Sequence, residues 1–99
     1  MFCNAPNFNQ YIGNWNTSNV TSMVSMFQYA SSYNQSMYWW SMSSMYDLSN
    51  MFYYATSFNQ NLTQWNVQYV TYYYAFRTGS ALTDANTPKR NMGGWMLVI

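Results

Sequence analysis

The sequence predicts a repeat solenoid of the α/β class, in which three units of equal length stack on one another. The dipeptide Met-Phe begins at Met1, Met26 and Met51, which sets the period at 25. Other residues recur in the same register: Ala5, Ala30 and Ala55, then Asn-Gln pairs beginning at Asn9, Asn34 and Asn59, then Trp15, Trp40 and Trp65. A fixed period of this size indicates units that bury their apolar surface only against neighbouring units.

Each unit is predicted to contain one short strand and one short helical turn. Residues 8–17 are rich in strand-forming side chains, but Ile12 and Trp15 are three positions apart, so we expect the strand to bend at Gly13. Residues 20–27 carry apolar side chains every three or four positions, which favours a helix. The second unit adds a capping-box pattern over residues 44–47 at the start of its helix.

A partial fourth unit follows the third. The interval from Val70 to Phe76 is one residue shorter than the interval from Val20 to Phe27, so we place a one-residue deletion there. The sequence then predicts two parts.

The first part is a solenoid of three complete units and a partial fourth over residues 1–82. The second part is an irregular tail or cap over residues 83–99. Met1 lies in phase within the first motif with no capping segment before it. This favours either a piece of a longer array or a unit that stacks end to end with copies of itself.

Composition excludes several classes of function. The chain has three basic residues, two acidic residues and no histidine, and Asp47 is the only charged residue before Arg77. A nucleic-acid partner is not expected, because binding phosphates requires clustered cations. No signal peptide is readable, and no apolar run approaches the length of about 20 residues that a membrane span needs. The single cysteine, Cys3, allows no intramolecular disulfide and no cysteine metal site.

The repeated motif resembles a known family. Met-Phe-x-x-Ala-x-x-Phe-Asn-Gln followed by Trp-Asn-Thr-Ser-Asn-Val-Thr-x-Met is similar to a repeat of matching length in mycoplasma-type and other bacterial surface lipoproteins, which is grouped with the BspA-like leucine-rich repeats. The resemblance covers Met1 to about Leu82. It implies a leucine-rich-repeat-like solenoid at the cell surface or outside the cell, with adhesion as its usual role. It implies no catalytic residue.

The Asn-Gln pairs recur in register, so stacking would place their amides above one another. The expected ladder consists of Asn9, Asn34, Asn59, Gln10, Gln35 and Gln60. Amides left unpaired in a buried turn would be costly, which favours a structural ladder with bonds to the next unit. A row of polar ligand-binding side chains is the alternative.

The aromatic residues divide into two classes. Those that recur in register are predicted to form the core, namely Trp15, Trp40, Trp65, Phe8, Tyr33 and Phe58. Others lie in columns that hold small or polar residues in the neighbouring units, and we expect these on the surface. The candidate ligand-binding residues are therefore Tyr11, Tyr38, Trp39, Tyr46, Tyr69 and Tyr72. Exposed tyrosine and tryptophan suit a glycan or a protein contact. Sequence drift on a permissive surface is the other interpretation.

Catalysis lacks its usual groups. There is no histidine, Asp47 and Asp84 lie in different units, and Cys3 has no base beside it. We therefore expect no enzyme, no cofactor and no metal. The sequence favours a non-catalytic binding or adhesion module that recognises a protein or glycan. A self-assembling repeat that forms filaments or arrays is the alternative, and ice binding is disfavoured because Thr17 is followed in its column by Met42 and Val67.

Overall fold

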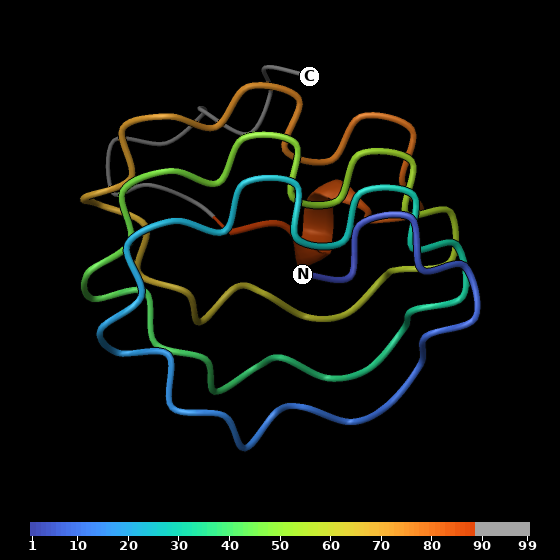
Figure 1. Cartoon of the computed structure of the whole chain (residues 1–99). Helices are drawn as coiled ribbons and strands as arrows, with labels where there is room; N and C mark the ends of the chain where they lie inside the picture. Colours follow the sequence, from blue (N-terminus) through green and yellow to red (C-terminus); the bar gives the residue numbers. More distant parts are fainter. Residues whose placement is uncertain (89–99) are drawn as a thin grey trace.

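The computed structural model describes residues 1–88 and shows a chain that winds in successive coils, each lying over the one before (Figure 1). We name residues 1–25 coil 1, residues 26–50 coil 2 and residues 51–75 coil 3. Residues 76–88 begin a further coil. The sequence predicts a solenoid over residues 1–82 and a tail or cap over residues 83–99. Most of that tail, residues 89–99, lies outside the described residues.

The predicted α/β class is wrong. Within residues 1–88 there is no α-helix and no extended strand. The one helical element there is the 3-10 helix η1, Asp84–Asn86. Two isolated parallel bridges link the coils, one between Ser22 and Asp47 and one between Asp47 and Tyr72. The coils are therefore not the leucine-rich-repeat-like units of strand and helix that the resemblance implied.

Turns take the place of the helix expected over residues 20–27. The apolar spacing of three residues fits a turn as well as a helix, and Met26 N donates to Met23 O at 3.2 Å. Ser25 has φ of 57°, in the left-handed region, which interrupts any right-handed helix. The intervening amides point to the next coil instead, and Phe27 N donates to Met51 O at 2.9 Å. Successive backbone amides thus alternate, because one closes a local turn and the next bonds to the neighbouring coil.

The strand expected over residues 8–17 is also absent. Trp15 N donates to Ile12 O at 3.1 Å, so the two residues close a turn that contains Gly13. The spacing of three that suggested a bend within a strand belongs to this turn. Likewise, Asp47 does not complete a capping box. Its carboxylate accepts a hydrogen bond from Ser49 N at 2.9 Å, two residues further along the chain.

The one-residue deletion lies later than the sequence indicated. Left-handed φ values recur at the repeat period up to the start of the fourth coil, at Asn4, Tyr29, Tyr54 and Gly79. The spacing then shortens: Asn59 N bonds to Asn34 Oδ1 at a sequence separation of 25, but Thr83 N bonds to Asn59 Oδ1 at a separation of 24. The missing residue therefore lies between Gly79 and Thr83. It does not lie between Val70 and Phe76, as the apolar pattern suggested.

This register explains the ring at Phe76. Phe52 N bonds to Phe76 O just as Phe27 N bonds to Met51 O. Phe76 therefore occupies the repeat position that holds methionine in the other coils. Its ring consequently meets Phe52 edge to face, at 88° and 5.4 Å between centroids. Arg77 follows in the phenylalanine column and forms an ion pair with Asp84.

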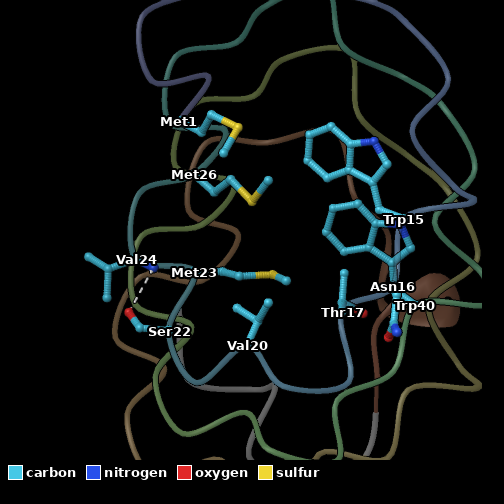
Figure 2. A pocket seen from close by; sticks show the side chains of 10 residues that line it. All are labelled: Met1, Trp15, Asn16, Thr17, Val20, Ser22, Met23, Val24, Met26 and Trp40. Atoms are coloured by element: carbon cyan, nitrogen blue, oxygen red, sulfur yellow. Dashed lines mark hydrogen bonds between the residues drawn. The ribbon is translucent and has the colours of Figure 1, made fainter.

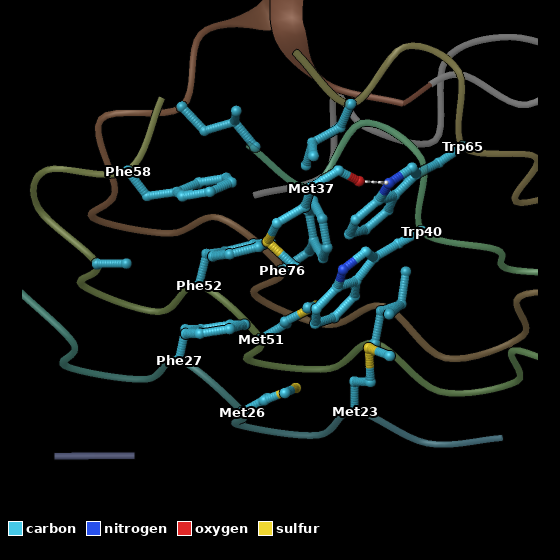
Figure 3. Packing of buried hydrophobic residues seen from close by; sticks show 14 of the residues in the cluster. Met23, Met26, Phe27, Met37, Trp40, Met51, Phe52, Phe58, Trp65 and Phe76 are labelled. Atoms are coloured by element: carbon cyan, nitrogen blue, oxygen red, sulfur yellow. Dashed lines mark hydrogen bonds between the residues drawn. The ribbon is translucent and has the colours of Figure 1, made fainter. Parts of the chain in front are cut away.

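The core consists of aromatic columns that run through the stack, with methionines between them (Figure 3). Phe27 and Phe52 stack at 5.6 Å, and Tyr33 and Phe58 stack at 5.7 Å beside them. Parallel coils place equal residues above one another, so the same ring type recurs along each column.

The tryptophan column is buried only in part. Trp40 and Trp65 are buried, whereas Trp15 is 41% exposed. The prediction that all three lie in the core is wrong for Trp15, because coil 1 contacts another described coil on one side alone. Phe8, also predicted as core, is half-buried for the same reason.

Candidate functional site

A turn at the edge of coil 2 presents the first pair of candidate aromatic residues. Met37 and Trp40 are buried and close the turn through a bond from Trp40 N to Met37 O at 3.1 Å. Tyr38 and Trp39 form the tip between them. Their rings meet edge to face at 4.8 Å, with Trp39 76% exposed and Tyr38 half-buried. The buried residues on either side hold this pair at the surface.

A second pair lies where coil 2 meets coil 3. The carbonyl oxygen of Tyr46 accepts bonds from Thr71 N at 2.8 Å and from Tyr72 N at 3.1 Å. These bonds bring the rings of Tyr46 and Tyr72 together at 5.2 Å and 82°. Both side chains are exposed. A side-chain hydrogen bond to Tyr72 raises the pKa of the Tyr46 phenol, and the charge of Tyr72 and the nearby Asp47 act in the same direction.

A shallow groove adjoins the second pair. It has a volume of about 300 Å³ and is lined by Ser49, Thr71, Tyr72, Tyr73 and Tyr74. The lining residues come from coil 2 and coil 3, and each of them carries a hydroxyl group. Hydroxyl groups and aromatic rings can hydrogen-bond to a polar ligand and cover its apolar faces.

The two remaining candidates stand apart from these pairs. Tyr11 is exposed in coil 1, where its ring occupies the space beside Gly13. Tyr69 is 62% exposed at the tip of a turn closed by Val70 N and Val67 O. Neither ring contacts another ring within residues 1–88. The six candidates therefore form two pairs and two single residues instead of one continuous patch.

Sequence reasoning missed a further aromatic cluster on coils 2 and 3, made of Tyr29, Tyr53, Tyr54 and Tyr74. The ring of Tyr29 stacks on Tyr54 at 5.9 Å and meets Tyr53 edge to face at 5.6 Å. Burial raises the pKa of the Tyr53 phenol, and the charges of the other three tyrosines add to this effect. The recurrence of tyrosine one full period apart, at Tyr29 and Tyr54, was the available signal.

The Asn-Gln residues join successive coils. Asn9 Oδ1 accepts bonds from Asn34 N at 2.8 Å and from Gln35 Nε2 at 3.2 Å. Asn34 Oδ1 repeats the arrangement with Asn59 N at 3.0 Å and Gln60 Nε2 at 2.9 Å.

At the end of this amide ladder that lies nearest the fourth coil, Asn59 Oδ1 accepts bonds from Thr83 N at 3.1 Å and Asn86 Nδ2 at 3.0 Å. At the other end Gln10 is exposed in coil 1. The oxygens of all three asparagines are therefore engaged within the protein.

An apolar hollow opens beside Trp15 and Val20 of coil 1 (Figure 2). Its volume is about 490 Å³. Trp15, Met23 and Val20 line it, with Met1 and Met26 at one edge. Met1 is 81% exposed, whereas the corresponding Met26 and Met51 are buried. Of its lining residues, Met1, Trp15 and Val20 are more exposed than their counterparts in coils 2 and 3.

Residues 1–95 match the family described as Mycoplasma protein of unknown function, DUF285. The chain belongs to this family. The match supports the mycoplasma-type repeat that the motif resembles, and its description says nothing of leucine-rich repeats or lipoproteins. In the same comparisons the chain matches no curated protein and no solved structure.

The described part of this DUF285 chain offers few reactive groups. Within residues 1–88 no three side chains of His, Cys, Asp or Glu lie together as a metal site would require. Cys3 is exposed and free. Among the same residues, no helix has the length and apolar character needed to cross a bilayer.

Proposed function

We propose that this chain is a non-catalytic binding module at the cell surface, of the kind found in bacterial lipoproteins, and that it recognises a protein or glycan through exposed aromatic residues. The observation that carries this proposal is the pair Tyr38 and Trp39, held at the tip of a turn between two buried residues. A large exposed ring that is fixed in place loses little conformational entropy on binding. Such rings are frequent at the centres of interfaces.

The low charge of residues 1–76 defines the type of recognition. Before Arg77, Asp47 is the only charged residue in the sequence. Binding would therefore depend on stacking and hydrogen bonds instead of ion pairs, and salt would affect it little. The Tyr46 and Tyr72 pair with its groove supplies a second contact on the same chain, so a ligand with repeated units could gain affinity by engaging both.

The test is a binding assay with defined probes, namely a printed glycan array together with immobilised collagen and fibronectin. We expect at least one probe to bind with little dependence on salt, and the double variant Y38A/W39A to lose most of that binding. Y11A is the comparison variant, because Tyr11 is a candidate that is also exposed but has no ring neighbour within the described residues, and an equal loss there would show that the pair has no special role. Circular dichroism should be the same for all variants. Binding that survives in Y38A/W39A would exclude this pair as the site.

Self-assembly is the second candidate function, and the hollow on coil 1 favours it. Three of its lining residues, Met1, Trp15 and Val20, correspond to residues that are buried in coils 2 and 3. Another copy of the chain that covered this hollow would bury Trp15 and Met1. Sedimentation velocity at several concentrations tests this: growth to large species that is lost in W15S supports assembly, and a concentration-independent monomer excludes it.

A further inference from the structure

Two tyrosine pairs cross the boundary between coil 2 and coil 3 in the same geometry. The rings of Tyr46 and Tyr72 lie 5.2 Å apart at 82°, and those of Tyr29 and Tyr53 lie 5.6 Å apart at 78°. Each pair has one member on each coil, so a covalent bond within either pair would connect the two coils.

The backbone holds both pairs in position. Tyr29 N donates to the carbonyl oxygen of Tyr53 at 2.9 Å, and Tyr72 N donates to the carbonyl oxygen of Tyr46 at 3.1 Å. The two members of a pair are therefore joined at the backbone as well as at the ring. Groups held in contact in this way react at high effective concentration.

We propose that Tyr46 with Tyr72, and Tyr29 with Tyr53, are sites of oxidative tyrosine coupling that join coil 2 to coil 3 through a carbon–carbon bond between the rings. The bond forms between the two carbons next to the phenol oxygens. In the product the two rings are twisted and the two hydroxyls lie side by side. The rings of each pair already lie crossed and next to one another, which brings them near this arrangement. The proposal does not depend on the proposed binding function.

The reaction requires a one-electron oxidant, such as a peroxidase using hydrogen peroxide. Each phenol loses one electron and one proton to give a phenoxyl radical. The two radicals couple, and the ring hydrogens at the new bond move to the oxygens and restore both phenols. The net loss is two hydrogen atoms from the protein, and one hydrogen peroxide becomes two waters.

Exposure and neighbours distinguish these pairs from the other tyrosines. Tyr46 and Tyr72 are 49% and 52% exposed, so a soluble oxidant reaches both. Tyr33 is fully buried, which shields it. Tyr11 and Tyr69 are exposed but contact no ring within residues 1–88, so radicals formed there have no partner in reach. Tyr54 is a competitor, since its ring contacts both Tyr29 and Tyr53.

Such links would give the stack covalent connections that cysteine cannot supply. The chain has a single cysteine, and no intrachain disulfide can form. A cross-link between residues far apart in sequence restricts the unfolded chain and so stabilises the fold. Coils 2 and 3 would then stay joined when the rest of the fold opens.

The experiment is to oxidise the dilute full chain with peroxidase and a limiting amount of hydrogen peroxide. We expect a monomeric product with dityrosine fluorescence and a mass lower by two hydrogens per link. Its yield should not depend on protein concentration. Tandem mass spectrometry of the digested product should find Tyr46 joined to Tyr72 and Tyr29 joined to Tyr53, and the thermal midpoint should rise.

Variants separate this geometry from general tyrosine reactivity. Y72F should abolish the link at Tyr46 and leave the link at Tyr29, whereas Y29F should do the reverse. Y69F is the matched control and should leave both. Products that are mainly intermolecular, or links spread over Tyr11 and Tyr69, would overturn the proposal, as would a Tyr46 link that persists in Y72F. Circular dichroism of each variant before oxidation confirms that the fold is unchanged.

Discussion

The indole nitrogen of Trp40 donates a hydrogen bond to the carbonyl oxygen of Ile12 at 3.0 Å, and this bond is buried. Trp65 repeats it one coil further on, with the carbonyl oxygen of Met37 at 3.0 Å (Figure 3). Each tryptophan thus adds a second hydrogen bond to a carbonyl of the coil before it, which also accepts one from its own turn, while filling the core. The repeated tryptophan is therefore a polar connection between coils as well as an apolar one.

We expect W65F to destabilise the fold. The substitution removes part of the buried ring and one of the two hydrogen bonds that Met37 O accepts, the other coming from Trp40 N. Losing one such bond costs about 0.5–1.5 kcal/mol, and the lost ring volume adds to this. Equilibrium unfolding in urea measures the loss. W15F is the control, because Trp15 is 41% exposed and its indole has no carbonyl acceptor in the described residues. An equal loss of stability in the two variants would show that ring volume, not the hydrogen bond, accounts for the effect.

The sequence identified the period and most of the core because both depend on residues repeating in register. Parallel stacking places like side chains together whatever the local backbone, so Phe27 and Phe52 could be paired without knowing the conformation between them. Local conformation could not be read in this way. Apolar residues three apart fit a helix and a series of turns equally well, and only the left-handed φ at Ser25 and Tyr29 decides between them.

The surface was harder to predict. Columns with polar residues identified Trp39 and Tyr69 as exposed, which they are. Which exposed side chains meet depends on where the turns place their tips, and the alignment of the repeats does not contain this information. The Tyr46 and Tyr72 pair joins positions that are not equivalent in the repeat, and it arises because Tyr72 N bonds to Tyr46 O. The hollow on coil 1 depends on which side of a coil is covered, which no single repeat reveals.

The amide ladder should require its acceptor oxygen. Asn34 Oδ1 accepts two bonds from coil 3, so N34A removes both and should cost about 1–2 kcal/mol. N34D keeps the oxygen acceptor and should retain most of the stability. Urea unfolding of the two variants beside the parent chain makes the comparison. If N34D is as unstable as N34A, the amide nitrogen matters instead of the oxygen.

Gly79 should not tolerate a side chain. Its φ is 74°, and an added Cβ would lie 2.6 Å from Cδ1 of Tyr54. G79A is therefore expected to lose about 1–3 kcal/mol of stability, through the left-handed conformation and the displaced ring together. In a Y54A background the ring is gone, so the same substitution should cost less. A double-mutant cycle from thermal unfolding separates the two contributions, and equal costs in both backgrounds would argue against the contact.

Removing the hydroxyl of Tyr33 should stabilise the protein. The ring is fully buried between Phe8 and Phe58, and its hydroxyl has no hydrogen-bond partner within residues 1–88. Burying a hydroxyl without a partner costs about 1–3 kcal/mol, so Y33F should gain stability of this order at neutral pH.

The same residue should give the fold an alkaline limit. Burial raises the pKa of the folded-state phenol far above its ordinary value, with a smaller contribution from Tyr11. The unfolded phenol titrates near its ordinary pKa of about 10. The unfolded chain therefore releases its proton first, so the contribution of Tyr33 is fully present below that pH and falls as pH rises above it. Urea unfolding from pH 8 to 11 should show the parent chain losing stability more steeply than Y33F. Y69F serves as the exposed control, and parallel pH profiles for the parent and Y33F would show that Tyr33 is not the titrating group.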